Sequence, residues 1–109
     1  MASSPTPQIR QNQIIPNVSP NCTLATVGTA AAQIIGSNIV RRGITFANPS
    51  ATATVWIAPA GVALLANTGI PLFPGATFAI QASGDYQANC AWQAIASAPG
   101  SPLTILEFV

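Results

Sequence analysis

The sequence predicts an all-β fold, a small antiparallel β-sandwich or jelly-roll-like barrel of about seven or eight strands preceded by an extended N-terminal arm. Short apolar segments recur every ~8 to 12 residues, and glycine, proline, asparagine or aspartate separates them. Helical spacing of apolar residues survives only over 88–98, and that stretch also alternates as a strand does, so we expect a strand there. The 109 residues, half of them hydrophobic, suffice for one core.

The first 21 residues form the predicted arm. They hold four of the ten prolines, with serine, glutamine and asparagine between them. Proline lacks a backbone N–H and restricts the residue before it, so this composition favours an extended segment over a helix. The arm is either a frayed terminus or an interface segment that lies along a neighbouring subunit. In the second interpretation its apolar residues Ile9, Ile14 and Ile15 make the contact.

The predicted sandwich domain covers residues 22–109. Its expected strands are 22–27, 30–35, 39–47, 53–58, 62–66, 76–82, 91–97 and 103–109. Around Trp56 both alternate series are apolar, which predicts a central strand covered on both sides, by this chain or by another subunit. The nearly continuous apolar run at 103–109 predicts a core strand. Between the prolines at 71 and 74, Leu72 and Phe73 are either core side chains or exposed interface groups.

Alternation within 39–47 puts Val40, Arg42, Ile44 and Phe46 on the core face. A guanidinium cannot be buried without an acceptor, and Asp85, Glu107 and the terminal carboxylate are the anions available. We therefore expect a structural ion pair that joins Glu107 to Arg41 or Arg42, within one subunit or across a subunit boundary.

The composition argues against most chemistry. Three arginines and no lysine are too few for binding to nucleic acid by phosphate contacts. Histidine is absent, and the two cysteines, Cys22 and Cys90, are 68 positions apart, so we expect no metal, no cofactor and two reduced, buried thiols. Asp85 and Glu107 are the only acid pair that hydrolysis could use, and we expect no enzyme. The longest apolar run, 53–66, is too short to span a membrane and contains Pro59.

The functional prediction rests on the small number of charged residues and the low net charge. Charged residues make up 5% of the chain, against about 25% in ordinary soluble domains, and the net charge is +1. Copies of such a molecule repel one another weakly, which favours packing against partners. We expect a homo-oligomer, a trimer or dimer. The alternative is a small neutral domain kept soluble by hydroxyl and amide groups.

Five segments carry a resemblance to a known family: RRGITFANP at 41–49, TVWIAP at 54–59, IPLFPGATF at 70–78, AWQAIAS at 91–97 and LTILEF at 103–108. Over about residues 38–109 the chain resembles small virion structural proteins of tailed bacteriophages, of the capsid decoration, cement or minor head-and-tail kind. The resemblance implies a β-sandwich bound in many copies to a shell or tail, without catalytic residues.

Two functions follow as hypotheses. The first is a capsid decoration or cement protein on the virion surface, assembled in the host cytoplasm, that binds the major capsid protein or another virion protein and stabilises the head. The second is a head- or tail-fibre component or carbohydrate-binding module. A sugar platform needs an exposed aromatic side chain with polar neighbours, and Trp92 and Tyr86 are the candidates. The other interpretation, a core position for Trp92, is the more common one for an aromatic residue.

Overall fold

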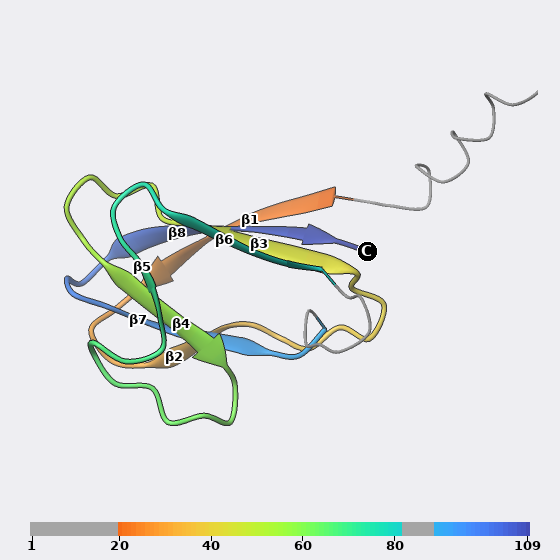
Figure 1. Ribbon diagram of the computed structural model, residues 1–109, viewed down its shortest axis with the longest axis horizontal. Coiled ribbons are helices and arrows are strands. Elements are labelled where there is room, and N and C mark those ends of the chain that lie inside the picture. The colour runs from red at the N-terminus through yellow and green to blue at the C-terminus, as the bar shows by residue number, and fades with distance from the viewer. Residues whose placement is uncertain (1–19, 82–88) are drawn as a thin grey trace, which may run out of the picture.

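The computed structural model describes residues 20–81 and 89–109, which form eight strands and no helix (Figure 1). The strands are β1 (Pro20–Val27), β2 (Ala32–Ile35), β3 (Gly43–Ala47), β4 (Val55–Pro59), β5 (Ile70–Leu72), β6 (Thr77–Gln81), β7 (Trp92–Ala96) and β8 (Ser101–Phe108). They pair antiparallel in two four-stranded sheets. The first sheet has the order β1-β8-β3-β6, and the second has the order β2-β7-β4-β5. The predicted all-β sandwich is confirmed.

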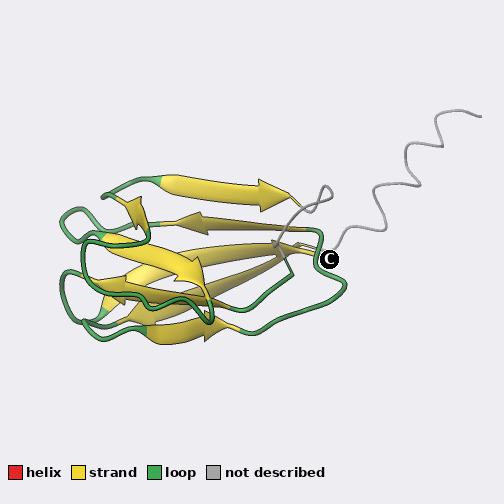
Figure 2. Ribbon diagram, turned by 60° about the horizontal axis from the view of Figure 1, so that its bottom comes forward, coloured by secondary structure: helices red, strands yellow, loops and turns green. Residues whose placement is uncertain are grey.

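The strand order is that of a jelly roll. The first strand pairs with the last, β2 pairs with β7, β3 with β6 and β4 with β5, so the chain is nested from its ends inward. In the part of the chain that the structure describes, the strands lie along a common direction and the loops gather at the two ends (Figure 2). The loop between β2 and β3 and the C-terminal end of β8 share one of these ends (Figure 1).

The core lies between the two sheets. Along β8, Leu103 and Ile105 are buried, whereas Pro102, Thr104 and Leu106 are half-buried on the other face. Trp92 of β7 is fully buried between the sheets, with its ring 5.1 Å from Phe46 of β3 and 6.5 Å from Phe78 of β6. The prediction that 103–109 is a core strand is confirmed, since β8 lies between β1 and β3. The described part of 88–98, residues 89–98, contains strand β7 rather than a helix.

The largest differences from the predicted strands are at three places. The strand β1 starts at Pro20, two residues before the expected domain boundary, and β3 starts only at Gly43 because 38–41 form a turn. The predicted strand at 62–66 is wrong. The strand that pairs with β4 is β5, where Leu72 lies opposite Val55, and 62–66 belong to the long β4–β5 connection. Apolar composition alone does not distinguish a strand from a loop that packs on a sheet.

The β4–β5 connection covers the outer face of the second sheet. Its Leu64 is buried against Ala58 of β4 and Ile95 of β7, and Trp56 packs beside them. The side-chain amide of Gln93 donates hydrogen bonds to the carbonyls of Pro59 and Val62 and ties the connection to β7. The expectation that β4 is covered on both sides is confirmed, and the cover is a segment of the same chain.

Candidate interaction surface

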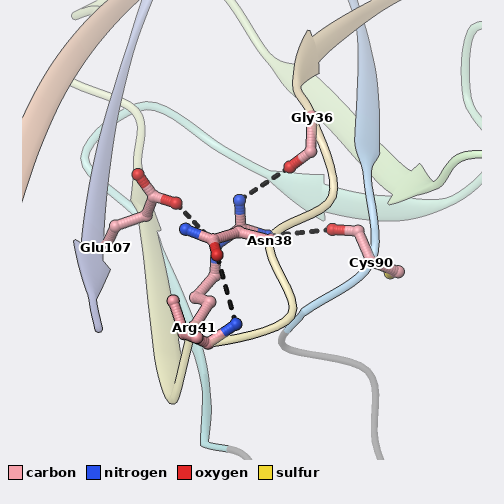
Figure 3. Close-up of polar contacts among 6 residues, drawn as sticks. Gly36, Asn38, Arg41, Cys90 and Glu107 are labelled. Carbon is pink, nitrogen blue, oxygen red and sulfur yellow. Dashed lines mark hydrogen bonds and ion pairs between the residues drawn. The ribbon is translucent and has the colours of Figure 1, made fainter.

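The guanidinium of Arg41 is the buried polar centre at the end of the sandwich where the β2–β3 loop lies (Figure 3). Its side chain is 1% exposed. The Nε atom donates to Glu107 Oε2 of β8 at 2.7 Å, Nη1 donates to the Cys90 carbonyl at 2.9 Å, and Nη2 donates to the Gly36 carbonyl at 2.7 Å. An arginine presents its donors in a rigid planar fork, so these three acceptors fix its orientation. They also join three separate segments of the chain.

This network holds a β-turn at residues 38–41. The Arg41 N–H donates to the Asn38 carbonyl at 3.0 Å, and the Val40 N–H donates to Asn38 Oδ1 at 3.1 Å. The Asn38 N–H in turn donates to the carbonyl of Asn89 at 2.9 Å. Asparagine at the first position of a turn commonly accepts such a hydrogen bond from the residue two positions later. The turn is therefore anchored at both of its ends.

The two central residues of this turn are unusual. They are Ile39 and Val40, whose exposed fractions are 87% and 62%. Proline, glycine, asparagine, aspartate and serine dominate such positions because each has a conformational reason to be there, and β-branched aliphatic residues have none. An adjacent apolar pair held out in solvent by an anchored turn is a candidate contact surface for another protein. We refer to Ile39 and Val40 as the turn tip.

The predicted core face of 39–47 is half wrong. Ile44 and Phe46 are buried as expected, but Val40 is exposed, and the buried arginine is Arg41 while Arg42 is exposed. Strand alternation starts at Gly43, and the turn before it reorients the chain, so the alternation cannot be extended back through 39–42. Of the three residues named for a structural ion pair, the structure brings Arg41 and Glu107 together and leaves Arg42 outside the pair.

Leu72 and Phe73 have opposite surroundings. Leu72 lies in β5 opposite Val55 and is buried in the core, so its assignment as an interface residue is wrong. Phe73 follows the end of β5 and has an exposed fraction of 60%. It precedes Pro74 and Gly75, and its carbonyl accepts a hydrogen bond from the N–H of Ala76 at 2.8 Å. Pairing in a sheet fixes which face Leu72 occupies, and the turn that follows releases Phe73 from that pattern.

Trp92 is 1% exposed and cannot be a sugar platform, so its assignment as a ligand contact is wrong. Phe46 and Phe78 are its aromatic neighbours, and its indole N–H has no hydrogen-bond partner among the described residues. The other residue of that hypothesis, Tyr86, lies outside the described residues. The same holds for the predicted interface residues Ile9, Ile14 and Ile15.

Cys22 and Cys90 are not joined in a disulfide. The expectation that both are buried is wrong for Cys22, which is exposed on β1, while Cys90 is half-buried beside Arg41. Desolvation raises the pKa of the Cys90 thiol above its ordinary value, and a backbone hydrogen bond and the charge of Arg41 oppose this in part.

The described residues contain no group of three or more histidine, cysteine, aspartate or glutamate side chains that could hold a metal ion. Nor is any helix in residues 20–81 and 89–109 long and apolar enough to cross a membrane. Glu107, one member of the acid pair considered above, is the ion-pair partner of Arg41, and Asp85 lies outside the described residues.

Comparisons with protein-family models, with curated proteins and with solved structures found no match to this chain.

Proposed function

We propose that this chain is a structural protein of a bacteriophage virion, a decoration or cement protein that binds the outside of the assembled capsid in many copies and stabilises it. The observation that supports it most is the character of the exterior. Over the described part of the chain, Arg42 is the one ionised side chain on the surface, because Arg41 and Glu107 are both buried. The same surface exposes six large apolar side chains: Leu24, Ile39, Val40, Val62, Leu65 and Phe73.

Such an exterior suits a protein that is covered by contacts. The interfaces of permanent assemblies are more hydrophobic than ordinary protein surface, and charged side chains are depleted at their centres. The turn tip supplies an apolar contact whose conformation is already set by the Arg41 network, so binding loses little conformational freedom. A decoration protein that binds only the assembled shell stabilises the shell by mass action, without any chemistry of its own.

The jelly-roll strand order agrees with this role without selecting it. Double-sheet jelly rolls are common in viral capsid proteins and also in lectins. Of the two aromatic residues on which the carbohydrate-binding alternative depended, Trp92 is enclosed between the two sheets, and Tyr86 lies outside the described residues. The motif resemblance at 41–49 and 70–78 points to virion proteins as well.

The test is to find the chain in particles and then to remove its contact. Mass spectrometry of purified virions of the phage that encodes the chain should detect it at many copies per head, and antibody labelling should place it on the capsid. Heads that lack the protein should bind the purified chain in cosedimentation. We expect a variant with Ile39→Ser and Val40→Ser to bind about tenfold more weakly or worse.

A matched control carries Val62→Ser and Leu65→Ser, which change two exposed apolar residues on the β4–β5 connection instead of the turn tip. It should bind heads like the unmodified chain. Absence of the protein from purified virions would refute the proposed function. Equal binding by the turn-tip variant and the unmodified chain would show that the turn tip is not the contact.

A further inference from the structure

The two sheets have four edge strands, and these differ in how they are protected from pairing with another chain. In the second sheet, β5 is three residues long and contains Pro71, and β2 is four residues long with a register shift between Gln33 and Ile35. Proline and bulges are both devices that block an edge. In the first sheet, β6 has five residues and β1 has eight. The longest open edge is therefore that of β1.

The strand β1 has none of the usual protection. Each of its eight residues pairs with β8 in one continuous register, and no described strand pairs with its other side (Figure 1). It carries no charged residue, and its single proline stands at the first position. Natural edge strands commonly place lysine at such sites to prevent association. Here the central outward position is instead Leu24, with an exposed fraction of 69%.

The side chains of β1 alternate between its two faces. Of the odd-numbered residues, Val27 is buried and Ala25 is half-buried against the second sheet, whereas Asn21 and Thr23 near the start of the strand are exposed. Cys22, Leu24 and Thr26 therefore lie on the outer face, opposite Leu106, Thr104 and Pro102 of β8. This outer strip contains no charge that a second identical strip would repel.

We propose that two copies of this chain pair edge to edge through β1, antiparallel about a two-fold axis, with Leu24 opposite the partner's Leu24. A two-fold axis perpendicular to the sheet keeps outward residues opposite outward residues, so the even-numbered side chains must face one another. In this register Cys22 lies opposite the partner's Thr26. The two first sheets then form one continuous eight-stranded sheet, and the open edge of β1 is removed in both copies.

A second copy is favoured over other occupants for two reasons. The edge carries no charge that would keep two copies apart, and with a net charge of +1 the copies repel each other weakly. Pairing of β1 with β6 of another copy would join different surfaces and continue into an open filament, whereas pairing of β1 with itself closes at two copies. The pairing deepens the proposed function, because it describes how neighbouring copies on a shell would meet. It rests on the proposed function only for the presence of a shell.

Light scattering of the full chain in buffer, with no capsid present, tests the pairing. We expect the mass of a dimer. Leu24→Lys, which puts two like charges opposite each other, should raise the dimer dissociation constant by about tenfold or more. Circular dichroism checks that this exposed position still allows folding. A monomer at high concentration, a trimer, or a Leu24→Lys variant that dimerises normally would overturn the proposal.

Cysteine cross-linking tests the register. In a Cys22→Ser background, Leu24→Cys should give a disulfide-linked dimer under mild oxidation, because the two residues at position 24 are direct neighbours across the axis. Thr26→Cys in the same background is the matched control. Two residues at position 26 are displaced by four positions, about 14 Å along the strands, which is beyond the reach of a disulfide. Equal cross-linking of both variants, or of neither, would overturn the pairing.

These measurements separate the two proposals. A chain that dimerises in buffer but is absent from virions refutes the proposed function and leaves the β1 pairing. A chain that is present in virions and binds heads as a monomer refutes the pairing and leaves the function.

Discussion

Replacement of Arg41 by methionine probes the buried network most directly. Methionine fills similar space but donates no hydrogen bond, so the change leaves Glu107 without its charged partner and the carbonyls of Gly36 and Cys90 without the guanidinium donor. Removal of one member of a buried ion pair costs about 3–5 kcal/mol, because the remaining charge stays in a poorly solvated site. A domain of this size has a total unfolding free energy of about 5–15 kcal/mol, so the loss is a large fraction of it.

Urea unfolding followed by tryptophan fluorescence is the assay. With an m value of about 2 kcal/mol/M, the loss corresponds to a midpoint lower by about 2 M. Arg41→Lys retains the charge but not the planar fork, so it should cost about 1–3 kcal/mol and remain measurable if Arg41→Met does not fold. Adding Glu107→Leu to Arg41→Met should recover part of the loss, because the unpaired carboxylate is gone.

Arg42→Met is the matched control, since Arg42 is exposed and outside the ion pair. Its effect on the unfolding free energy should be within about 0.5 kcal/mol. If Arg41→Met were as mild as Arg42→Met, the hydrogen bonds of Arg41 would not stabilise the fold, and the account of an anchored turn would be refuted.

Three further predictions concern single residues. Asn48 is buried, and its amide donates to the carbonyls of Ala53 and Leu72, both at 2.8 Å. Asn48→Ala should therefore lower the unfolding free energy by about 2–4 kcal/mol in thermal or urea unfolding. A loss under about 1 kcal/mol would contradict these hydrogen bonds. At Gly69, where φ is +86°, an added Cβ would lie 2.8 Å from the Ile57 carbonyl oxygen. Gly69→Ala should therefore lower the unfolding free energy by about 1–3 kcal/mol. This loss should exceed that of Gly61→Ala, where φ is also positive but an added Cβ would meet open space. Equal losses for the two variants would count against the clash at Gly69. Because burial raises the pKa of the Cys90 thiol, a thiol reagent near pH 8 should modify exposed Cys22 first. Cys22→Ser should therefore abolish the fast phase of the labelling reaction. An unchanged fast phase would disprove this order. The same shift means that Cys90 holds its proton in the fold after the unfolded chain has released it, so its contribution to stability is lost as the pH rises through that raised pKa.

The fold could be predicted from the sequence because its signals are local. The nearly continuous apolar run of β8 and the breakers between apolar segments depend on neighbouring residues alone, and the sandwich contains both as expected. The β4–β5 connection could not be predicted in this way. Leu64 is as apolar as a strand residue, but it is buried by packing on the outer face of the second sheet, which is a contact between segments distant in the sequence.

The candidate site shows the same division. A buried arginine paired with Glu107 follows from charge, because the chain offers few anions and a guanidinium needs an acceptor. Which of two adjacent arginines is buried depends on where strand β3 begins, and that is set by the turn at 38–41. Ile39 and Val40 were therefore expected inside a strand, although Asn38 before them is a residue type that often starts a turn.

The chain has few charged residues, yet two of them are buried together as an ion pair. The presence of this buried ion pair bears on function. A buried ion pair stabilises a fold little more than well-packed apolar residues of the same volume would, so stability alone does not account for Arg41 and Glu107. What apolar residues could not do is hold three segments in fixed directions at once, as the Arg41 fork does with its three acceptors. The hydrophobic effect acting on its own would draw Ile39 and Val40 against the nearest apolar surface. The Arg41 network opposes that collapse and holds the turn so that Ile39 and Val40 stay exposed, as the proposed capsid contact requires.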